Sequence, residues 1–162
     1  MISEKRLCVN VAMRKLLHGI DGGLLSEYCK SDIKKLVLSE INTAIEQDNV
    51  IALYQPNINM PVEDILSSYD DLTTYECACN EIYINSEIGD RLPIAVISLK
   101  NALKYALGHK FSNRQFRIII SVDCGEYIGI NAWFHLNREN ENYFDPNIEN
   151  YEQPAMYLEI AT

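Results

Sequence analysis

The chain has 162 residues, of which 48% are hydrophobic and 23% charged, a composition typical of one folded domain rather than of a disordered segment. Its net charge of −9 disfavours nucleic acid and anionic membranes as partners, because both are polyanions. The longest apolar runs are far shorter than the roughly 18–20 residues that span a bilayer, and no signal-peptide core follows Lys5 and Arg6. We therefore expect a single cytoplasmic domain over residues 1–162.

The first third of the chain is expected to be mainly helical. Apolar residues at loosely helical spacing predict a helix over 4–18, although residues 7–11 also fit a short strand. Residues 24–47 give the clearest helical pattern, because their apolar side chains repeat at helical intervals. Ser31 followed by Asp32 can cap a helix, so this region is predicted to be either one helix or two.

Short elements are expected in the middle of the chain. Residues 50–54 form an apolar run that predicts a strand, and a proline is placed to begin a short helix over 61–68. The segment 73–86 has no clear period, apart from a weak strand signal at 82–84. A second proline begins a longer predicted helix over 93–107, whose apolar residues share one face.

The strongest local pattern predicts a β-hairpin in the C-terminal third. Side chains alternate along 115–123 and along 127–136, and the three residues between these runs include Gly125. Residues 137–153 are polar and are predicted to be mostly loop, and the run 155–161 predicts a last strand. These elements predict an α+β fold, in which an antiparallel sheet built around the C-terminal hairpin packs against N-terminal and central helices.

Charge is distributed unevenly along the chain. Residues 51–90 carry eight acids and no Lys or Arg, residues 91–120 carry six bases and no acid, and residues 121–162 carry eight acids and one base. A long stretch without a base favours a basic protein partner, although acids also simply increase solubility. Tyrosines beside acids suit such a surface, because they add contact area with a polar tip. The residues predicted to bind the partner are Asp70, Asp71, Glu76, Glu139, Glu141 and Tyr143.

No catalytic, metal-binding or cofactor-binding motif is recognisable. The histidines His18, His109 and His135 are far apart, and Cys77 and Cys79 lack the second ligand pair usual in zinc sites. No glycine-rich phosphate loop is present. The cysteines number five, which, without a secretion signal, predicts free and mostly buried thiols rather than a disulfide framework. We therefore predict a protein that is not an enzyme and needs no cofactor.

A run of residues in the C-terminal third resembles a known protein family. It comprises the predicted hairpin with Phe134 and His135, then Arg138 with two nearby glutamates, and finally the segment 147–154 leading into the last strand. Over roughly residues 113–161, this run resembles bacterial toxin-immunity proteins, including those of contact-dependent growth inhibition systems. The resemblance implies a protein without catalytic activity that binds the C-terminal toxin domain of its own system, often a nuclease, and blocks it.

Charge and resemblance lead to the same expectation. We expect an immunity protein that neutralises a cognate toxin domain, such as that of a CdiA-like effector, through an acidic surface. A nuclease needs a basic surface to hold phosphates, and an acidic inhibitor complements that surface. Two alternatives stay open, namely a small cytosolic enzyme whose site assembles only in three dimensions and an adaptor module without a toxin. A deep pocket with convergent titratable groups would favour the enzyme.

Overall fold

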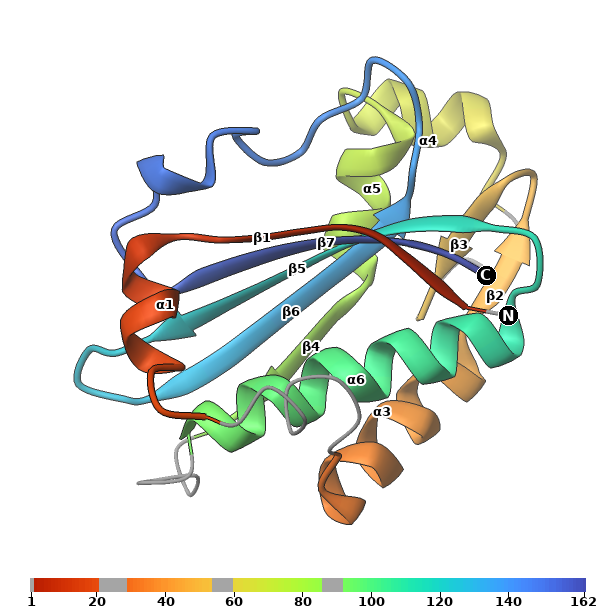
Figure 1. The fold of residues 1–162 in the computed structure, drawn as a ribbon. Helices are drawn as coiled ribbons and strands as arrows, with labels where there is room; N and C mark the ends of the chain where they lie inside the picture. The colour runs from red at the N-terminus through yellow and green to blue at the C-terminus, as the bar shows by residue number, and fades with distance from the viewer. Residues whose placement is uncertain (1, 21–28, 54–59, 86–91) are drawn as a thin grey trace.

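A five-stranded antiparallel sheet forms the centre of the structure, a computed structural model that describes residues 2–20, 29–53, 60–85 and 92–162. The strand order is β1-β7-β5-β6-β4 (Figure 1). The strands are β1 (Ser3–Val9), β4 (Glu81–Ile84), β5 (Gln115–Asp123), β6 (Gly129–Leu136) and β7 (Ala155–Ala161). Helices pack against this sheet, so the predicted α+β class is confirmed.

The predicted C-terminal hairpin is confirmed as β5 and β6. Their even-numbered residues from 116 to 122 and from 130 to 136 are all apolar and buried, as the alternation requires. Strand β6 begins at Gly129, two residues later than the predicted start at 127. Strand β7 has the predicted bounds, and it lies inside the sheet between β1 and β5.

The helix predicted over 4–18 is wrong in its first half. Residues 3–9 form strand β1, and only Val11–Leu16 form a helix, α1. Pairing with β7 decides the outcome, because hydrogen bonds from a neighbouring strand outweigh a weak helical preference. Asn10 separates the two elements, since its side-chain oxygen accepts a hydrogen bond from the backbone N–H of Met13 at 2.8 Å.

The helix predicted over 24–47 is correct in its central part. Helix α3 (Ser31–Thr43) begins at the predicted second start, whereas residues 21–28 lie outside the described residues. The end of the predicted helix instead enters a hairpin of β2 (Ile45–Gln47) and β3 (Val50–Ala52). The turn residues Asp48 and Asn49 have φ values of 51° and 64°, the left-handed conformation that a two-residue hairpin turn needs.

Two short helices precede β4. Helix α4 (Val62–Ser68) matches the prediction for 61–68, and α5 (Leu72–Cys79) occupies the segment that showed no clear period. The weak strand signal at 82–84 corresponds to β4. Residue 54, the end of the strand predicted from 50, lies outside the described residues.

Helix α6 (Leu92–Lys110) extends three residues beyond its predicted end. Its last residue, Lys110, completes the C-terminal end of α3. The Lys110 Nζ donates hydrogen bonds to the backbone carbonyls of Ile41, Asn42 and Ala44 at 2.8, 2.7 and 2.6 Å. Carbonyls at a helix end lack partners within the helix, and a positive charge there is favourable.

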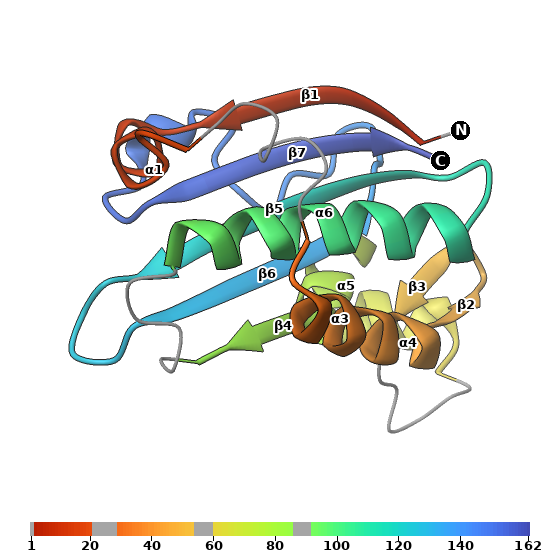
Figure 2. The same ribbon diagram turned by 60° about the horizontal axis from the view of Figure 1, so that its bottom comes forward.

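The two faces of the sheet are covered differently. Helices α6 and α3 lie across the inner face, and their buried side chains share one hydrophobic core with the sheet (Figure 2). On the outer face, residues 137–154, which we call the strap, arch over the strands (Figure 1). The strap contains one short 3-10 turn, Ile148–Asn150. Within the four described ranges, no helix combines the length and apolar character needed to cross a membrane.

Candidate functional site

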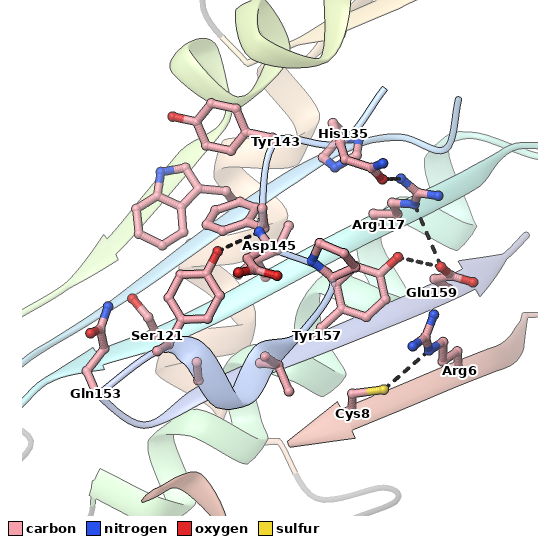
Figure 3. Close-up of a pocket in the computed structure, with 18 residues that line it drawn as sticks. Arg6, Cys8, Arg117, Ser121, His135, Tyr143, Asp145, Gln153, Tyr157 and Glu159 are labelled. Carbon is pink, nitrogen blue, oxygen red and sulfur yellow. Dashed lines mark hydrogen bonds and ion pairs between the residues drawn. The ribbon is translucent and has the colours of Figure 1, made fainter. Parts of the chain in front are cut away.

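A pocket lies between the outer face of the sheet and the strap (Figure 3). Side chains of β1, β5, β6 and β7 form its floor, and strap residues from 142 to 153 form its roof. Its volume is about 140 Å³. A cavity of this order can hold a molecule the size of an aromatic ring.

Four ionisable side chains form a row across the floor, because their strands pair in register. Arg6 of β1 opposes Glu159 of β7, which opposes Arg117 of β5. Arg117 in turn opposes His135 of β6. Directly opposed residues of antiparallel strands place their side chains on one face, about 5 Å apart. The sheet therefore brings together four residues that are far apart in sequence, which we call the charged row (Figure 3).

Arg117 is the central member of the charged row, and it keeps an unused hydrogen-bond donor. Its Nη1 donates to the strap, to the carbonyl of Glu141 at 3.0 Å and to Asn142 Oδ1 at 2.9 Å. Its Nε lies 3.7 Å from Glu159 Oε1, which is an ion pair but too long for a hydrogen bond. The Nε atom is buried and has no hydrogen-bond partner among the residues that the structure describes. An unpaired buried donor is costly, and an acceptor that reached this atom would offset the cost.

Arg6 is the exposed end of the charged row. Its Nε donates to Cys8 Sγ at 3.3 Å, and its guanidinium lies 5.7 Å from the centroid of the Tyr157 ring. The Tyr157 hydroxyl donates a hydrogen bond to Glu159. Burial, together with this bond, raises the pKa of Tyr157, so the hydroxyl stays protonated. Among the described residues, the terminal nitrogens of Arg6 have no hydrogen-bond acceptor.

His135 is buried and neutral, with 2% of its surface exposed. Burial lowers its pKa to about 4, and this effect outweighs the hydrogen bond from its ring to Leu136, which acts in the opposite direction. Its Nδ1 lies 2.8 Å from the backbone carbonyl of Leu136. Because a carbonyl can only accept, Nδ1 carries the proton and Nε2 is an unprotonated acceptor. No described residue donates to Nε2.

Beyond the charged row, the pocket becomes aromatic. Ile119 of β5 opposes Trp133 of β6 on the floor. Phe144 of the strap lies against three rings, with centroid distances of 5.8 Å to Trp133, 4.9 Å to Tyr143 and 6.2 Å to Tyr151. These tilted and edge-on arrangements are the ones that aromatic pairs prefer. The pocket is therefore polar at one end and aromatic at the other.

Both ends of the strap are anchored to the body of the protein. Near its start, Glu141 accepts hydrogen bonds from the backbone N–H and the hydroxyl of Thr73 at 3.1 and 2.6 Å. Near its end, Asn10 Nδ2 donates to the carbonyls of Tyr151 and Gln153 at 3.0 and 2.8 Å. These bonds hold the roof of the pocket over the floor.

The arrangement fits ligand binding better than nucleophilic catalysis. His135 could act as a base, but the nucleophiles Cys8 and Ser121 are distant from it. Cys8 lies three strands away, roughly 14 Å, and Ser121 lies four residues along β5 from the residue opposite His135, roughly 13 Å. A nucleophile needs hydrogen-bond contact with its base. Within the part of the chain that the structure describes, the pocket therefore holds no activated cysteine or serine.

The cysteines are all free thiols, as predicted, but they are less buried than expected. Cys77 is buried, Cys124 is exposed, and the other three are half-buried. Burial raises the pKa of Cys77 to about 12, so this thiol is unreactive. In the described ranges, no three His, Cys, Asp or Glu side chains come close enough together to hold a metal ion.

Five of the six predicted partner-binding residues have an exposed or half-buried side chain. Asp70 and Glu139 are exposed. Asp71 accepts a backbone hydrogen bond as the N-cap of α5, and Glu141 is bound to the first turn of the same helix. Tyr143 is 44% exposed and forms part of the pocket roof. The structure thus brings the two acidic segments together, but it gives Asp71 and Glu141 structural roles.

The prediction for Glu76 is wrong, because its side chain is fully buried. Its carboxylate accepts hydrogen bonds from the backbone N–H groups of Ile51 and Leu136 at 2.7 and 2.8 Å, and from both terminal nitrogens of Arg138 at 2.8 Å. Burial by itself would lower the pKa of Arg138, but the bonds and charge of Glu76 outweigh it and raise this pKa. Glu76 therefore joins α5 to β3 and β6 and is not available to a partner.

The charged row was not predicted from the sequence. The alternation along 115–123 and 127–136 places Arg117 and His135 on the less apolar face of the predicted hairpin, but no local pattern links them to Arg6 or Glu159. The alternation of 155–161 does contain a signal, because its odd positions include a tyrosine and a glutamate that must share one face. The position of Arg6 in the charged row depends on the pairing of β1 with β7, which the sequence pattern does not reveal.

One family model matches this chain, and it describes the Uncharacterized protein PM0498 family over residues 8–162. The chain belongs to this family. No curated protein and no solved structure matches it. The matched residues of this PM0498 family member include the strap and three of the four residues of the charged row, with Arg6 lying just outside.

Proposed function

We propose that this PM0498 family member is an immunity protein that binds a cognate toxin domain and neutralises it. The observation that supports the proposal best is an exposed acidic end of the molecule. It is made by Glu63, Asp64, Asp70 and Glu139, and we call it the acidic end. These residues come from α4, from the turn before α5 and from the start of the strap, which lie together in Figure 1. The resemblance of residues 113–161 to toxin-immunity proteins supports the same function.

Hydrogen bonds hold the parts of the acidic end together. The bonds from Thr73 to Glu141 fix the start of the strap against the first turn of α5. Asp70 lies three residues before Thr73, and Glu139 lies two residues before Glu141. The two exposed carboxylates therefore belong to segments that cannot separate without breaking these bonds.

Among the described residues, no ion pair involves a carboxylate of the acidic end. Residues 51–90 contain no Lys or Arg, and the nearby Arg138 is occupied by Glu76 at 2.8 Å. An uncompensated negative surface accelerates association with a basic partner and contributes to specificity. Nuclease domains carry basic surfaces that hold phosphates, so a nuclease toxin is the partner that this surface would fit best.

The test is co-expression with the polypeptide encoded immediately upstream, followed by affinity purification and a growth assay. Under the proposal, the two chains co-purify, and cells that express the upstream polypeptide grow only when this protein is present. Failure of both binding and growth rescue would contradict the proposal.

Charge variants locate the interface. Asp70→Asn combined with Glu139→Gln should slow association several-fold at low salt and weaken its salt dependence, because both residues are exposed and neither holds the fold. The matched control is Asp123→Asn with Glu126→Gln at the tip of the β5–β6 hairpin, which lies far from the acidic end (Figure 1). Equal effects of the two double variants would show that only net charge matters.

A second candidate is a small-molecule-binding protein, including an enzyme of that kind. The pocket under the strap favours it, because convergent ionisable groups in a cleft are typical of ligand sites. The lack of contact between His135 and Cys8 or Ser121 favours binding over catalysis by a nucleophile.

A further inference from the structure

We propose that the pocket under the strap binds a small aromatic carboxylate that carries a hydrogen-bond donor beside its carboxyl group. This inference concerns a different surface from the acidic end and does not depend on toxin binding. It rests on the unused hydrogen-bonding groups of the charged row, on the aromatic wall and on the size of the cavity.

The charged row selects an anionic head group. Arg6 and Arg117 supply two positive charges, Glu159 supplies one negative charge, and His135 is neutral. Glu159 is further occupied by the hydroxyl of Tyr157. The row thus has a surplus of one positive charge, and its donors without a hydrogen-bond partner among the described residues are the buried Nε of Arg117 and the terminal nitrogens of Arg6. A carboxylate supplies the acceptors that these guanidinium groups lack.

A second acid in the lining, Asp145, does not cancel this preference. It lies on the strap and is fully exposed, so solvent screens its charge. Its two carboxylate oxygens accept hydrogen bonds from the backbone of Asn147 at 2.8 Å and from the side chain of Asn150 at 2.6 Å. Its carboxylate therefore shapes the strap, while the charged row forms the polar end of the floor.

His135 adds a second requirement at the same end. Its Nε2 is an unprotonated acceptor, and only 2% of the residue's surface is exposed. The side chains of His135 and Arg117 are direct neighbours across β5 and β6. A ligand that satisfies both must present a donor next to its carboxylate, within about 5 Å, as an ortho substituent on a ring does.

The rest of the pocket selects a flat apolar body. Ile119 and Trp133 line the floor next to the charged row, and Phe144 and Tyr151 close the roof. A volume of about 140 Å³ leaves room for one six-membered ring. An aromatic ring in this space stacks against Trp133 or Phe144, as aromatic pairs prefer.

The probe is 2-aminobenzoate, whose amino group has one N–H to spare after bonding its own carboxylate. Trp133 is the chain's single tryptophan and lines the pocket, so its fluorescence reports occupancy directly. Titrations with 2-aminobenzoate, benzoate and benzamide should give decreasing affinity in that order. Benzamide keeps the ring but lacks the charge, so equal binding of benzamide and benzoate would overturn the proposal.

Variants assign the two head-group contacts. Arg117→Met should weaken both carboxylates about tenfold more than it weakens benzamide, since it removes a charge-assisted hydrogen bond to the carboxylate in addition to the two bonds of Arg117 to the strap. His135→Phe should abolish only the advantage of 2-aminobenzoate over benzoate. Arg6→Gln, at the exposed end of the charged row, provides a second test that leaves Arg117, Glu159 and His135 in place, and Lys5→Gln on the same strand is its control. Unchanged affinity in both arginine variants would overturn the proposal, because the probe would then bind away from the charged row.

Discussion

The inner and outer faces of the sheet are built on opposite principles. On the inner face, the side chains of β5 and β6 are apolar without exception and share one core with α3 and α6. On the outer face, the same two strands carry Arg117, Ser121 and His135 beneath a strap that leaves a cavity of about 140 Å³. Adjacent residues of one strand therefore serve different purposes.

This difference separates residues that stabilise the fold from residues that are available to the proposed ligand. Close packing on the inner face makes every methylene matter for folding. On the outer face, a buried donor without a partner among the described residues, such as Arg117 Nε, reduces stability, and the proposed ligand would offset that cost. The predictions below test whether this separation holds.

The largest effect is expected where a charge is buried outside the pocket. Glu76→Leu should lower the free energy of unfolding by about 3–5 kcal/mol, because it leaves the charge of Arg138 buried without its partner. Chemical denaturation measures this loss. The double variant Glu76→Leu with Arg138→Met should recover much of it, since no unpaired charge remains. A single variant as stable as the wild type would show that Arg138 finds another partner and that Glu76 is dispensable.

Neighbouring isoleucines of β5 give the most direct comparison of the faces. Ile118 is fully buried in the core, whereas Ile119 lies on the pocket floor and outside the core cluster. Ile118→Ala should cost about 3–4 kcal/mol, because it creates a new cavity in packed surroundings. Ile119→Ala should cost about 1–2 kcal/mol, because its side chain already borders a cavity. Equal losses in urea unfolding would mean that the outer face is packed as tightly as the inner one.

His135 predicts a pH dependence that originates on the outer face. Its pKa is about 4 in the folded protein and 6.5 as the ordinary value, so below pH 6.5 the unfolded chain takes up a proton that the folded protein does not. Stability should therefore fall as the pH decreases from 6.5 to 4, by about 3 kcal/mol in total. Besides burial, the charges of Arg117 and Arg138 favour the neutral ring, and Asp71 opposes them.

The measurement is the difference in unfolding free energy between wild type and His135→Phe from pH 7.5 to 4. Comparing the two proteins removes the contribution of acids and other histidines that titrate in the same range. Parallel pH profiles would show that His135 is readily protonated in the folded protein, and Nε2 would then be a donor instead of an acceptor.

Local patterns in the sequence predict the inner face well and the outer face poorly. The alternation in 115–136 identifies the hairpin and its buried residues, because every second residue of a strand points to the same face and here those residues are apolar. The charged row depends on β1 lying beside β7, a pairing between residues about 150 positions apart that no local period encodes. Glu76 was misassigned for a related reason, since its role depends on Arg138 and on backbone groups of two other elements.

The smallest effect on folding is expected at Arg6, and its size bears on the meaning of the charged row. The side chain is exposed, and its hydrogen bond to Cys8 lies at the surface. Arg6→Gln should change the unfolding free energy by less than about 0.5 kcal/mol, as Lys5→Gln should. If instead Arg6→Gln destabilised the protein clearly more than Lys5→Gln did, the row would serve to hold β1 against β7. Equal stability of the two variants, together with weaker 2-aminobenzoate binding in Arg6→Gln alone, would separate binding from folding on this face of the sheet.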